Sequence, residues 1–158
     1  MAAAKPAPAG VTAAAVSARF GLALLIKTLE VTSKRGVGLP QLSMWIERAR
    51  EEAAVLAEAA NDDIVAAPEP KRIEIPMMAA RSAAAGLDLC AEAAGSVRGA
   101  LAADLGVAAM MLCAAVRGIL LCVESNAGEY EADQRREIEL HALAQHESIL
   151  KHVSKAAR

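Results

Sequence analysis

Apolar and polar residues recur along most of the chain with the spacing of amphipathic helices. The segment 41–67 is the clearest case, because apolar residues return every three or four positions and charged residues occupy the opposite face. This pattern predicts five helices, over residues 12–33, 41–67, 77–97, from 101 or 104 to about 126, and 129–155. The sequence therefore predicts an all-α fold, an up-and-down bundle of about five helices.

The ends of the expected helices carry residues that usually start and stop helices. Thr12 follows a segment with proline and glycine, and it is a candidate N-cap of the first helix. That helix is expected to stop where Lys34 and Arg35 precede two glycines, since cations and glycines favour a helix C-terminus. Three prolines within 68–76 predict an extended connection before the third helix.

The fourth expected helix differs from the others in its hydrophobic pattern. Residues 105–123 are apolar around the whole circumference of a helix, with Arg117 as the exception. A helix that is apolar on all sides is buried on all sides. We therefore expect this helix at the centre of the bundle or between bundles.

Composition narrows both the fold and the function. Apolar residues make up 55% of the 158 residues and the net charge is −2, which excludes a disordered chain. Alanine, the best helix former, supplies 39 residues and aromatic residues only 2%, which disfavours a β-rich fold. Because the chain has no basic excess and few aromatic rings to stack on bases, nucleic-acid binding is also disfavoured.

The small size of alanine predicts an association with a second subunit. Alanines pack helices closely but bury little apolar area each, so a monomer would have a thin core. We therefore expect a homodimer, formed by one domain spanning residues 1–158 with a flexible N-terminal segment at 1–10.

No segment of the sequence has the pattern of a targeting signal or a membrane span. The N-terminus lacks the apolar stretch of a signal peptide. The longest uncharged apolar stretch, 105–116, is shorter than the roughly 20 residues of a spanning helix. Three cysteines without metal-ligand spacing fit reduced thiols, and Cys113 and Cys122 are out of phase on one helix and cannot pair. We expect a cytoplasmic protein that binds no membrane.

The histidines give no sign of a metal or catalytic site. His141, His146 and His152 all lie on the fifth expected helix, with spacings that do not bring three ligands to one face. We interpret them as solvated or interface residues and expect no metal.

Polar residues set among apolar ones are more informative. Asp104 is either a functional carboxylate or an acid in the first turn of the fourth helix, favoured by the helix dipole. Asn126 is either functional or a C-cap before Gly128. Arg117 is either functional or an arginine that is paired or extends its charge into solvent.

Three stretches of the sequence resemble the cyclodeaminase/cyclohydrolase family, which includes the helical domain of formiminotransferase-cyclodeaminase and the methenyltetrahydrofolate cyclohydrolases. The start, at 6–14, is similar to a Pro-x-Pro-Gly-Gly-Gly-Ser loop, with only Gly10 of the three glycines retained and Thr12 in place of the serine. The stretch 75–109 is similar to a Val-Pro-led helix followed by a Ser-Asp-x-x-Val-Ala-Ala signature around Asp104. The stretch 114–126 is similar to a signature that ends in Asn126.

This resemblance implies a dimeric helical bundle that acts on the one-carbon unit at N5 and N10 of tetrahydrofolate. One branch of the family forms 5,10-methenyl-tetrahydrofolate from the 5-formimino form, and the other hydrates the methenyl form. Asp104 is then the candidate general acid/base, and the ligand is a folate or another pterin. The other implied ligand-binding residues are Gly10, Thr12, Lys34, Arg35 and Asn126.

Two functions from different classes remain open at this point. The first is a folate enzyme, either a cyclohydrolase or a cyclodeaminase, which the retained Asp104 and Asn126 favour. The second is a non-catalytic dimeric scaffold or binding protein derived from that family. The altered glycine loop favours this second function.

Overall fold

The computed structural model describes residues 10–35, 39–64, 71–124 and 129–156, and these residues form five α-helices without a strand. The helices are α1 (Gly10–Lys34), α2 (Gln41–Ile64), α3 (Lys71–Ala94), α4 (Ala100–Glu124) and α5 (Glu129–Ala156). The predicted all-α class and the number of helices are confirmed. The expected flexibility of 1–10 falls almost wholly outside the described residues.

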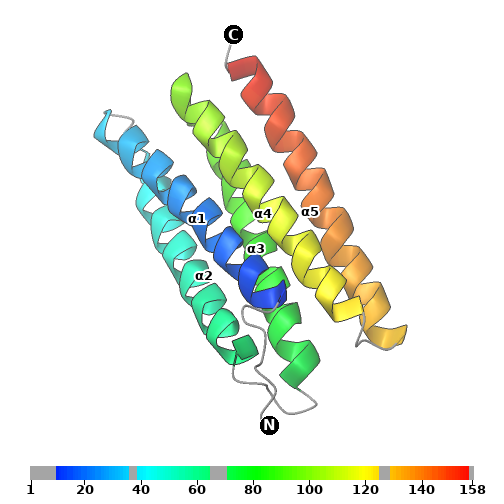
Figure 1. The fold of residues 1–158 in the computed structure, drawn as a ribbon. Coiled ribbons are helices and arrows are strands. Elements are labelled where there is room, and N and C mark those ends of the chain that lie inside the picture. Colours follow the sequence, from blue (N-terminus) through cyan, green and yellow to red (C-terminus); the bar gives the residue numbers. More distant parts are fainter. Residues whose placement is uncertain (1–9, 36–38, 65–70, 125–128, 157–158) are drawn as a thin grey trace.

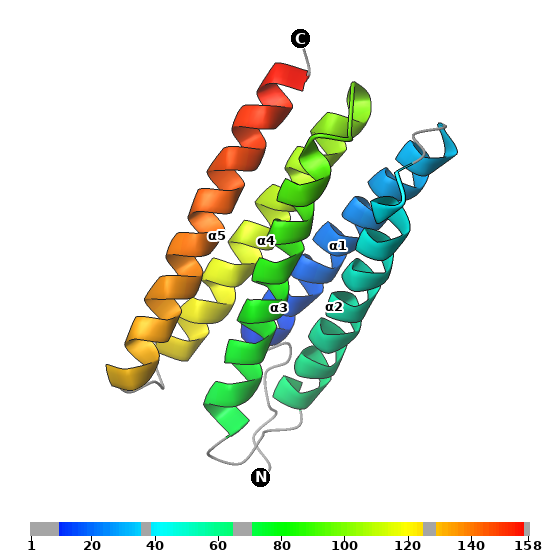
Figure 2. The same ribbon diagram turned by 180° about the vertical axis from the view of Figure 1, so that it is seen from behind.

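Consecutive helices run in opposite directions, so the chain forms an up-and-down bundle (Figure 1). Helices α1 to α4 form a four-helix unit, in which α1 packs against α2 and α4, and α3 packs against the same two helices. Helix α5 packs on the outer side of α3 and α4, as the view from behind shows (Figure 2). Helix α4 thus contacts three helices, as its apolar pattern predicts.

Close contact between α1 and α4 depends on small residues at their interface. A Cβ atom added at Gly21 would stand 3.0 Å from Cγ of Leu112, and one added at Gly118 would stand 3.4 Å from Cβ of Ala14. Leucines then fill the space between the helices, and Leu22 and Leu112 are completely buried. The core is therefore built from large aliphatic side chains set among alanines and glycines.

The start of α3 differs from the sequence prediction. The prolines within 68–76 predict an extended segment, but α3 begins at Lys71 and includes Pro76. Pro76 is the sixth residue of the helix, so it removes a single intrahelical hydrogen bond near the helix start. Ile75 and Met77 on either side of it are buried in the core. The burial of these side chains stabilises a helical turn that local sequence rules disfavour.

Part of the apolar surface of α1 and α4 stays exposed in one chain. By length and composition alone both helices could cross a membrane, which differs from the prediction made from the short uncharged stretch 105–116, although 56% of the most apolar window of α4 is buried inside the bundle. Phe20 on α1 is 64% exposed, and Met110 and Leu121 on α4 are 54% and 69% exposed. The central helix is therefore buried against three helices but is apolar on its free side as well.

Burial controls the chemistry of one cysteine. Cys90 of α3 is fully buried, and this burial raises the pKa of its thiol to about 12. The thiol stays protonated in the folded protein up to that pH, whereas an unfolded chain loses the proton near pH 9. The contribution of Cys90 to the free energy of unfolding is therefore fully present below pH 9, and it is lost as the pH rises toward 12.

We expect the stability of the wild type to fall by about 1.4 kcal/mol more per pH unit above pH 9 than that of Cys90→Ala, because one proton is released on unfolding. Urea unfolding at pH 8, 9 and 10 measures the difference between the two proteins. Equal pH dependence in both proteins would contradict the assignment to Cys90.

Candidate functional site

The Asp104 carboxylate forms an ion pair between α4 and α1. Its Oδ2 atom lies 2.6 Å from Nζ of Lys27, and the Asp104 side chain is 33% exposed. Helix α4 begins at Ala100, so Asp104 is its fifth residue, and the first turn contains no acid. The alternative that Asp104 is an acid of the first turn is therefore wrong. Its position is set by a cation on the neighbouring helix.

Gly10 and Thr12 lie at the opposite end of the α1–α4 pair. A Cβ atom at Gly10 would stand 2.6 Å from Sγ of Cys122, near the C-terminus of α4. Lys27, the partner of Asp104, is 15 residues further along α1 than Thr12, which is about 22 Å along a helix axis. Because α1 and α4 are antiparallel, Asp104 does not lie beside Gly10 and Thr12 within one chain, although the resemblance implies one site for all three residues.

Thr12 lies inside α1, so its prediction as the N-cap is also wrong. The helix begins at Gly10, and the buried Thr12 hydroxyl donates a hydrogen bond of 3.3 Å to the carbonyl oxygen of Ala60 on α2. Asn126 lies outside the described residues.

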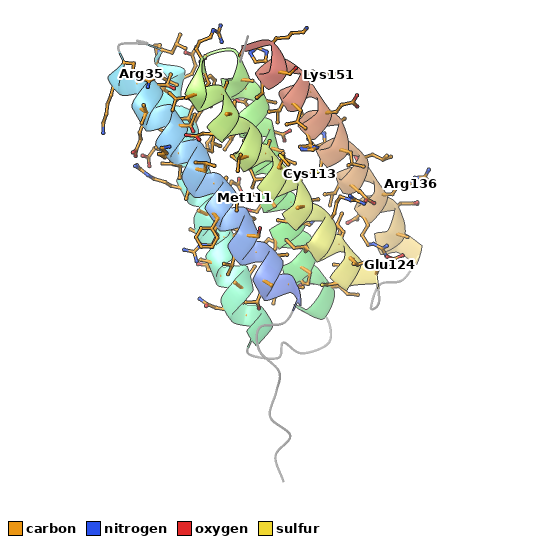
Figure 3. The ribbon with its side chains drawn as sticks, turned by 45° about the horizontal axis from the view of Figure 1, so that its top comes forward. Arg35, Met111, Cys113, Glu124, Arg136 and Lys151 are labelled. Atoms are coloured by element: carbon orange, nitrogen blue, oxygen red, sulfur yellow. The ribbon has the colours of Figure 1, made fainter. Side chains whose placement is uncertain are left out.

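Lys34 and Arg35 lie at the same end of the bundle as Asp104 and are exposed. Figure 3 shows Arg35 at one end of the molecule and Glu124, on the C-terminal turn of α4, at the other. Arg35 also lines a small cavity of about 70 Å³ together with Thr32, Ser96, Arg98 and Leu101. Lys34 and Arg35 are therefore the only predicted binding residues at the Asp104 end of the chain among those the structure describes.

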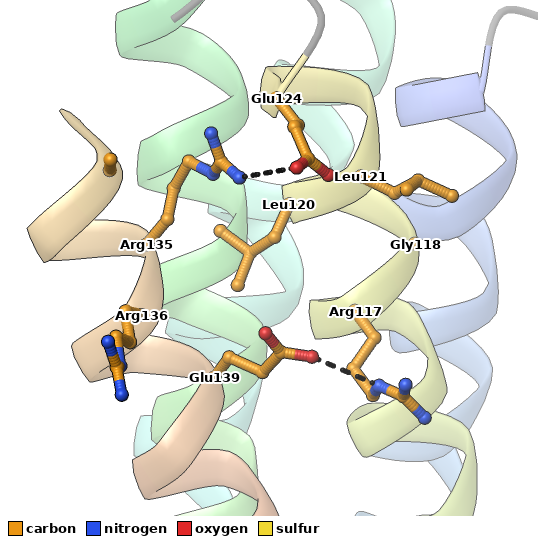
Figure 4. Close-up of a pocket in the computed structure, with 9 residues that line it drawn as sticks. Arg117, Gly118, Leu120, Leu121, Glu124, Arg135, Arg136 and Glu139 are labelled. Atoms are coloured by element: carbon orange, nitrogen blue, oxygen red, sulfur yellow. Dashed lines mark hydrogen bonds and ion pairs between the residues drawn. The ribbon is translucent and has the colours of Figure 1, made fainter. Parts of the chain in front are cut away.

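A larger pocket lies between α4 and α5, at the end of the bundle that carries Gly10 (Figure 4). Its volume is about 370 Å³. It combines arginines and glutamates with a small apolar surface, and is lined by Arg117, Gly118, Leu120, Leu121, Glu124, Ala132, Arg135, Arg136 and Glu139. We call it the α4–α5 pocket.

Two ion pairs cross this pocket from α4 to α5. Nε of Arg117 lies 3.3 Å from Oε1 of Glu139, and a terminal nitrogen of Arg135 lies 3.5 Å from Oε1 of Glu124 (Figure 4). Arg117 is thus paired, as one interpretation of the sequence expected. Cys113 lies nearby, and desolvation by burial raises the pKa of its thiol. Arg117 lowers this pKa and so partly opposes the shift, whereas Glu139 raises it.

Of the charged residues in this pocket, only Arg117 stands out in the sequence, because it interrupts an apolar helix. Arg135 and Arg136 are adjacent on a polar helix, where such residues usually face solvent. The side chain of Arg135 is only 19% exposed. The position of Arg117 opposite two consecutive arginines depends on the packing of α5 against α4, which the sequence pattern does not give.

A third polar cluster joins α3 to α5. Oδ1 of Asp88 accepts a hydrogen bond of 2.9 Å from Gln145 and lies 2.7 Å from Nε2 of His141, which is half exposed. His141 is thus at a helix interface, one of the two positions expected for the histidines. Among the residues that the structure describes, no three histidine, cysteine or acidic side chains are grouped to hold a metal ion.

Residues 70–146 match the family model described as formiminotransferase-cyclodeaminase. The matched segment begins just before α3 and extends through most of α5, so it contains Asp104 and the whole α4–α5 pocket, but not α1 or α2. No curated protein matches the chain. This segment, just under half of the chain, is therefore similar to the formiminotransferase-cyclodeaminase family, in agreement with the resemblance seen in the sequence.

Proposed function

We propose that the chain is a folate one-carbon enzyme of the formiminotransferase-cyclodeaminase family, a methenyltetrahydrofolate cyclohydrolase or a formiminotetrahydrofolate cyclodeaminase. The observation that carries the proposal is the family match, because it includes Asp104 and all the residues that line the α4–α5 pocket. The proposed ligand is a tetrahydrofolate derivative, and no metal takes part.

Asp104 is the proposed general acid/base. In the hydration branch, the oxygen of a water molecule bonds to the methenyl carbon while the bond between that carbon and N5 breaks. One proton of the water reaches N5 and the other is released, so one group must take a proton and return it. The Asp104 carboxylate is partly exposed to water, so a water molecule and a ligand nitrogen can both reach it.

The proposed homodimer would complete this site. Within one chain, Gly10 and Thr12 lie at the opposite end of α1 from Asp104, so a second copy is the simplest source of their counterparts. The exposed apolar side chains Met110 and Leu121 are eleven residues apart on α4, which puts them on one face, and an antiparallel contact of α4 with its copy would cover them. Such a contact would also place the N-terminal part of α4 in one copy beside the C-terminal part of α4 in the other.

We expect the wild type to elute as a dimer in size-exclusion chromatography with light scattering, and Met110→Glu to elute as a monomer at the same micromolar concentration. A charge at the centre of an apolar interface would be buried without a partner. Leu140→Glu is the matched control, because Leu140 is 57% exposed on α5, away from this face. A monomeric wild type would contradict the dimer, and a dimeric Met110→Glu would contradict this interface.

A non-catalytic binding or scaffold protein is the second candidate function. It is favoured by the partners of Asp104 and Thr12, since the carboxylate is held in an ion pair and the hydroxyl contacts the backbone of α2. Groups that are engaged in holding helices together need no reaction to explain their presence.

The decisive test measures the loss of methenyl-tetrahydrofolate absorbance and the release of ammonia from 5-formimino-tetrahydrofolate. We expect one of the two reactions to exceed its spontaneous rate in proportion to protein concentration. Binding of 5-formyl-tetrahydrofolate, at a hundred times its dissociation constant, should stabilise the fold by about 2.7 kcal/mol. Stabilisation without turnover would favour the binding protein. The absence of both stabilisation and turnover would refute the folate assignment.

A further inference from the structure

We propose that the α4–α5 pocket binds carboxylate groups, and that its arginines, rather than Lys34 and Arg35, hold the glutamate tail of the folate. Because Asp104 lies at the other end of α4 in the same chain, such a folate would lie across the proposed dimer, with its tail in the pocket of one copy and its reacting atoms at Asp104 of the other. The carboxylate site stands on the geometry of the pocket alone. The identity of the ligand as a folate tail rests on the proposed function.

The first observation is a buried hydrogen-bond donor without an acceptor. Nε of Arg135 is buried and has no hydrogen-bond partner among the described residues. Buried polar atoms in proteins are nearly always hydrogen-bonded, and an arginine Nε–H can only donate. An acceptor supplied by a ligand would satisfy it. The geometry of a guanidinium favours a carboxylate, which accepts two parallel hydrogen bonds.

The second observation is that the arginines of the pocket use few of their donors. The contact between Arg135 and Glu124 is 3.5 Å long, and that between Arg117 and Glu139 is 3.3 Å long. Each guanidinium has five N–H donors. Arg136 takes part in no ion pair or hydrogen bond within the described part of the chain. Both glutamates can therefore stay in place while a ligand carboxylate joins the same cations.

The charge and shape of the pocket define the class of ligand. Its lining carries three arginines and two glutamates, so the ionised groups leave one excess positive charge. Leu120 lies between the two ion pairs in Figure 4, and Gly118 and Ala132 add further apolar surface. A volume of about 370 Å³ falls within the range of small-molecule sites. These properties fit a molecule with carboxylates on an apolar or aromatic body, such as an aminobenzoyl-glutamate.

The opposite end of the bundle is less suited to this role. Arg35 and Arg98 line a cavity of about 70 Å³, less than a fifth of the volume of the α4–α5 pocket. Arg98 donates a hydrogen bond of 3.0 Å to the carbonyl oxygen of Val97, so part of its donor capacity is used locally. Among the residues lining this cavity, none has a buried donor that lacks a partner.

The test compares four variants in the full chain. Arg135→Gln and Arg117→Gln each remove one cation from the pocket, and Arg136→Gln does so at an exposed position where folding is not at risk. Arg35→Gln is the matched control, because it removes the same charge at the other end. Far-UV circular dichroism and unfolding midpoints verify that every variant is folded.

Two probes separate the carboxylate site from the folate assignment. Calorimetry measures the Kd of 5-formyl-tetrahydrofolate carrying one or three glutamates. Nuclear magnetic resonance follows the Arg135 Nε–H signal during titration with glutarate, a dicarboxylate without a pterin.

We expect the pocket variants to raise the Kd for 5-formyl-tetrahydrofolate about tenfold to a hundredfold, as loss of a charge-assisted hydrogen bond does, with no change in Arg35→Gln. The three-glutamate form should bind more tightly than the one-glutamate form. Glutarate should shift the Arg135 signal in the wild type and in Arg35→Gln.

The outcomes distinguish the two proposals. A raised Kd in Arg35→Gln but not in the pocket variants would overturn the pocket and leave the folate enzyme intact. A glutarate response that depends on Arg117 and Arg136, without folate binding, would support the pocket and refute its ligand. An unchanged Arg135 signal with glutarate and unchanged folate binding in all pocket variants would overturn the carboxylate site itself.

Discussion

Replacing Asp104, the proposed general acid/base, by asparagine is expected to lower the catalysed rate on the proposed folate substrate by about a hundredfold to ten-thousandfold, the usual contribution of such a group. A carboxylate can accept a proton from water and deliver it to N5, whereas a carboxamide can do neither. The fold should survive, because the ion pair with Lys27 is partly exposed and such pairs contribute about 0–1 kcal/mol. The measurement is the initial rate with saturating methenyl-tetrahydrofolate, corrected for spontaneous hydrolysis.

Two control variants separate the chemistry of Asp104 from its role in helix packing. Lys27→Met breaks the same ion pair but keeps the carboxylate, so it should retain most of the activity. Asp88→Asn removes a carboxylate that contacts His141 between α3 and α5, also inside the matched segment, and should leave the rate unchanged. An active Asp104→Asn would reduce Asp104 to an ion-pair partner. An equal loss of catalysed rate in Lys27→Met would assign the effect to the ion pair between Lys27 and Asp104 instead.

The helices were predictable because the evidence for them is local. Alanine content, three-to-four spacing and terminal residues together give α2 its start at Gln41 and α5 its start at Glu129, as the structure has them. The central location of α4 was predictable for a similar reason, since a helix that is apolar on every side has few other places to lie. Pro76 marks the limit of this approach, because the burial of its neighbours outweighs its local preference.

The candidate site was less predictable, because its geometry depends on how helices pair. The family signature identifies Asp104, but its contact with Lys27 rather than with Gly10 follows from the antiparallel packing of α1 and α4. Arg135 and Arg136 have the pattern of surface residues, and only the packing of α5 on α4 puts Arg135 beside a pocket. Contacts between residues far apart in the sequence carry no periodic signal.

Gly21→Val is expected to be the most destabilising single substitution at the α1–α4 interface. The Cβ atom alone would stand 3.0 Å from Cγ of Leu112 and 3.1 Å from the carbonyl oxygen of Ala108. The Ala108 oxygen belongs to the backbone of α4, so a rotamer change cannot relieve this contact. Overpacking of this kind costs typically about 1–3 kcal/mol, and the two methyl groups of valine put the cost at the upper end. For a chain of this size we expect a melting temperature lower by about 6–12 °C.

Gly118→Ala is the matched control for this prediction, because it adds a Cβ atom to the same interface from the other helix. That atom would stand 3.4 Å from Cβ of Ala14, an ordinary contact distance. Alanine also favours a helix over glycine by up to about 1 kcal/mol, so this variant should be as stable as the wild type or more stable. Urea and thermal unfolding of the three proteins provide the comparison. If Gly21→Val is as stable as the wild type, α1 and α4 can move apart. If only Gly21→Val loses stability, the close approach of the two helices at Gly21 is established.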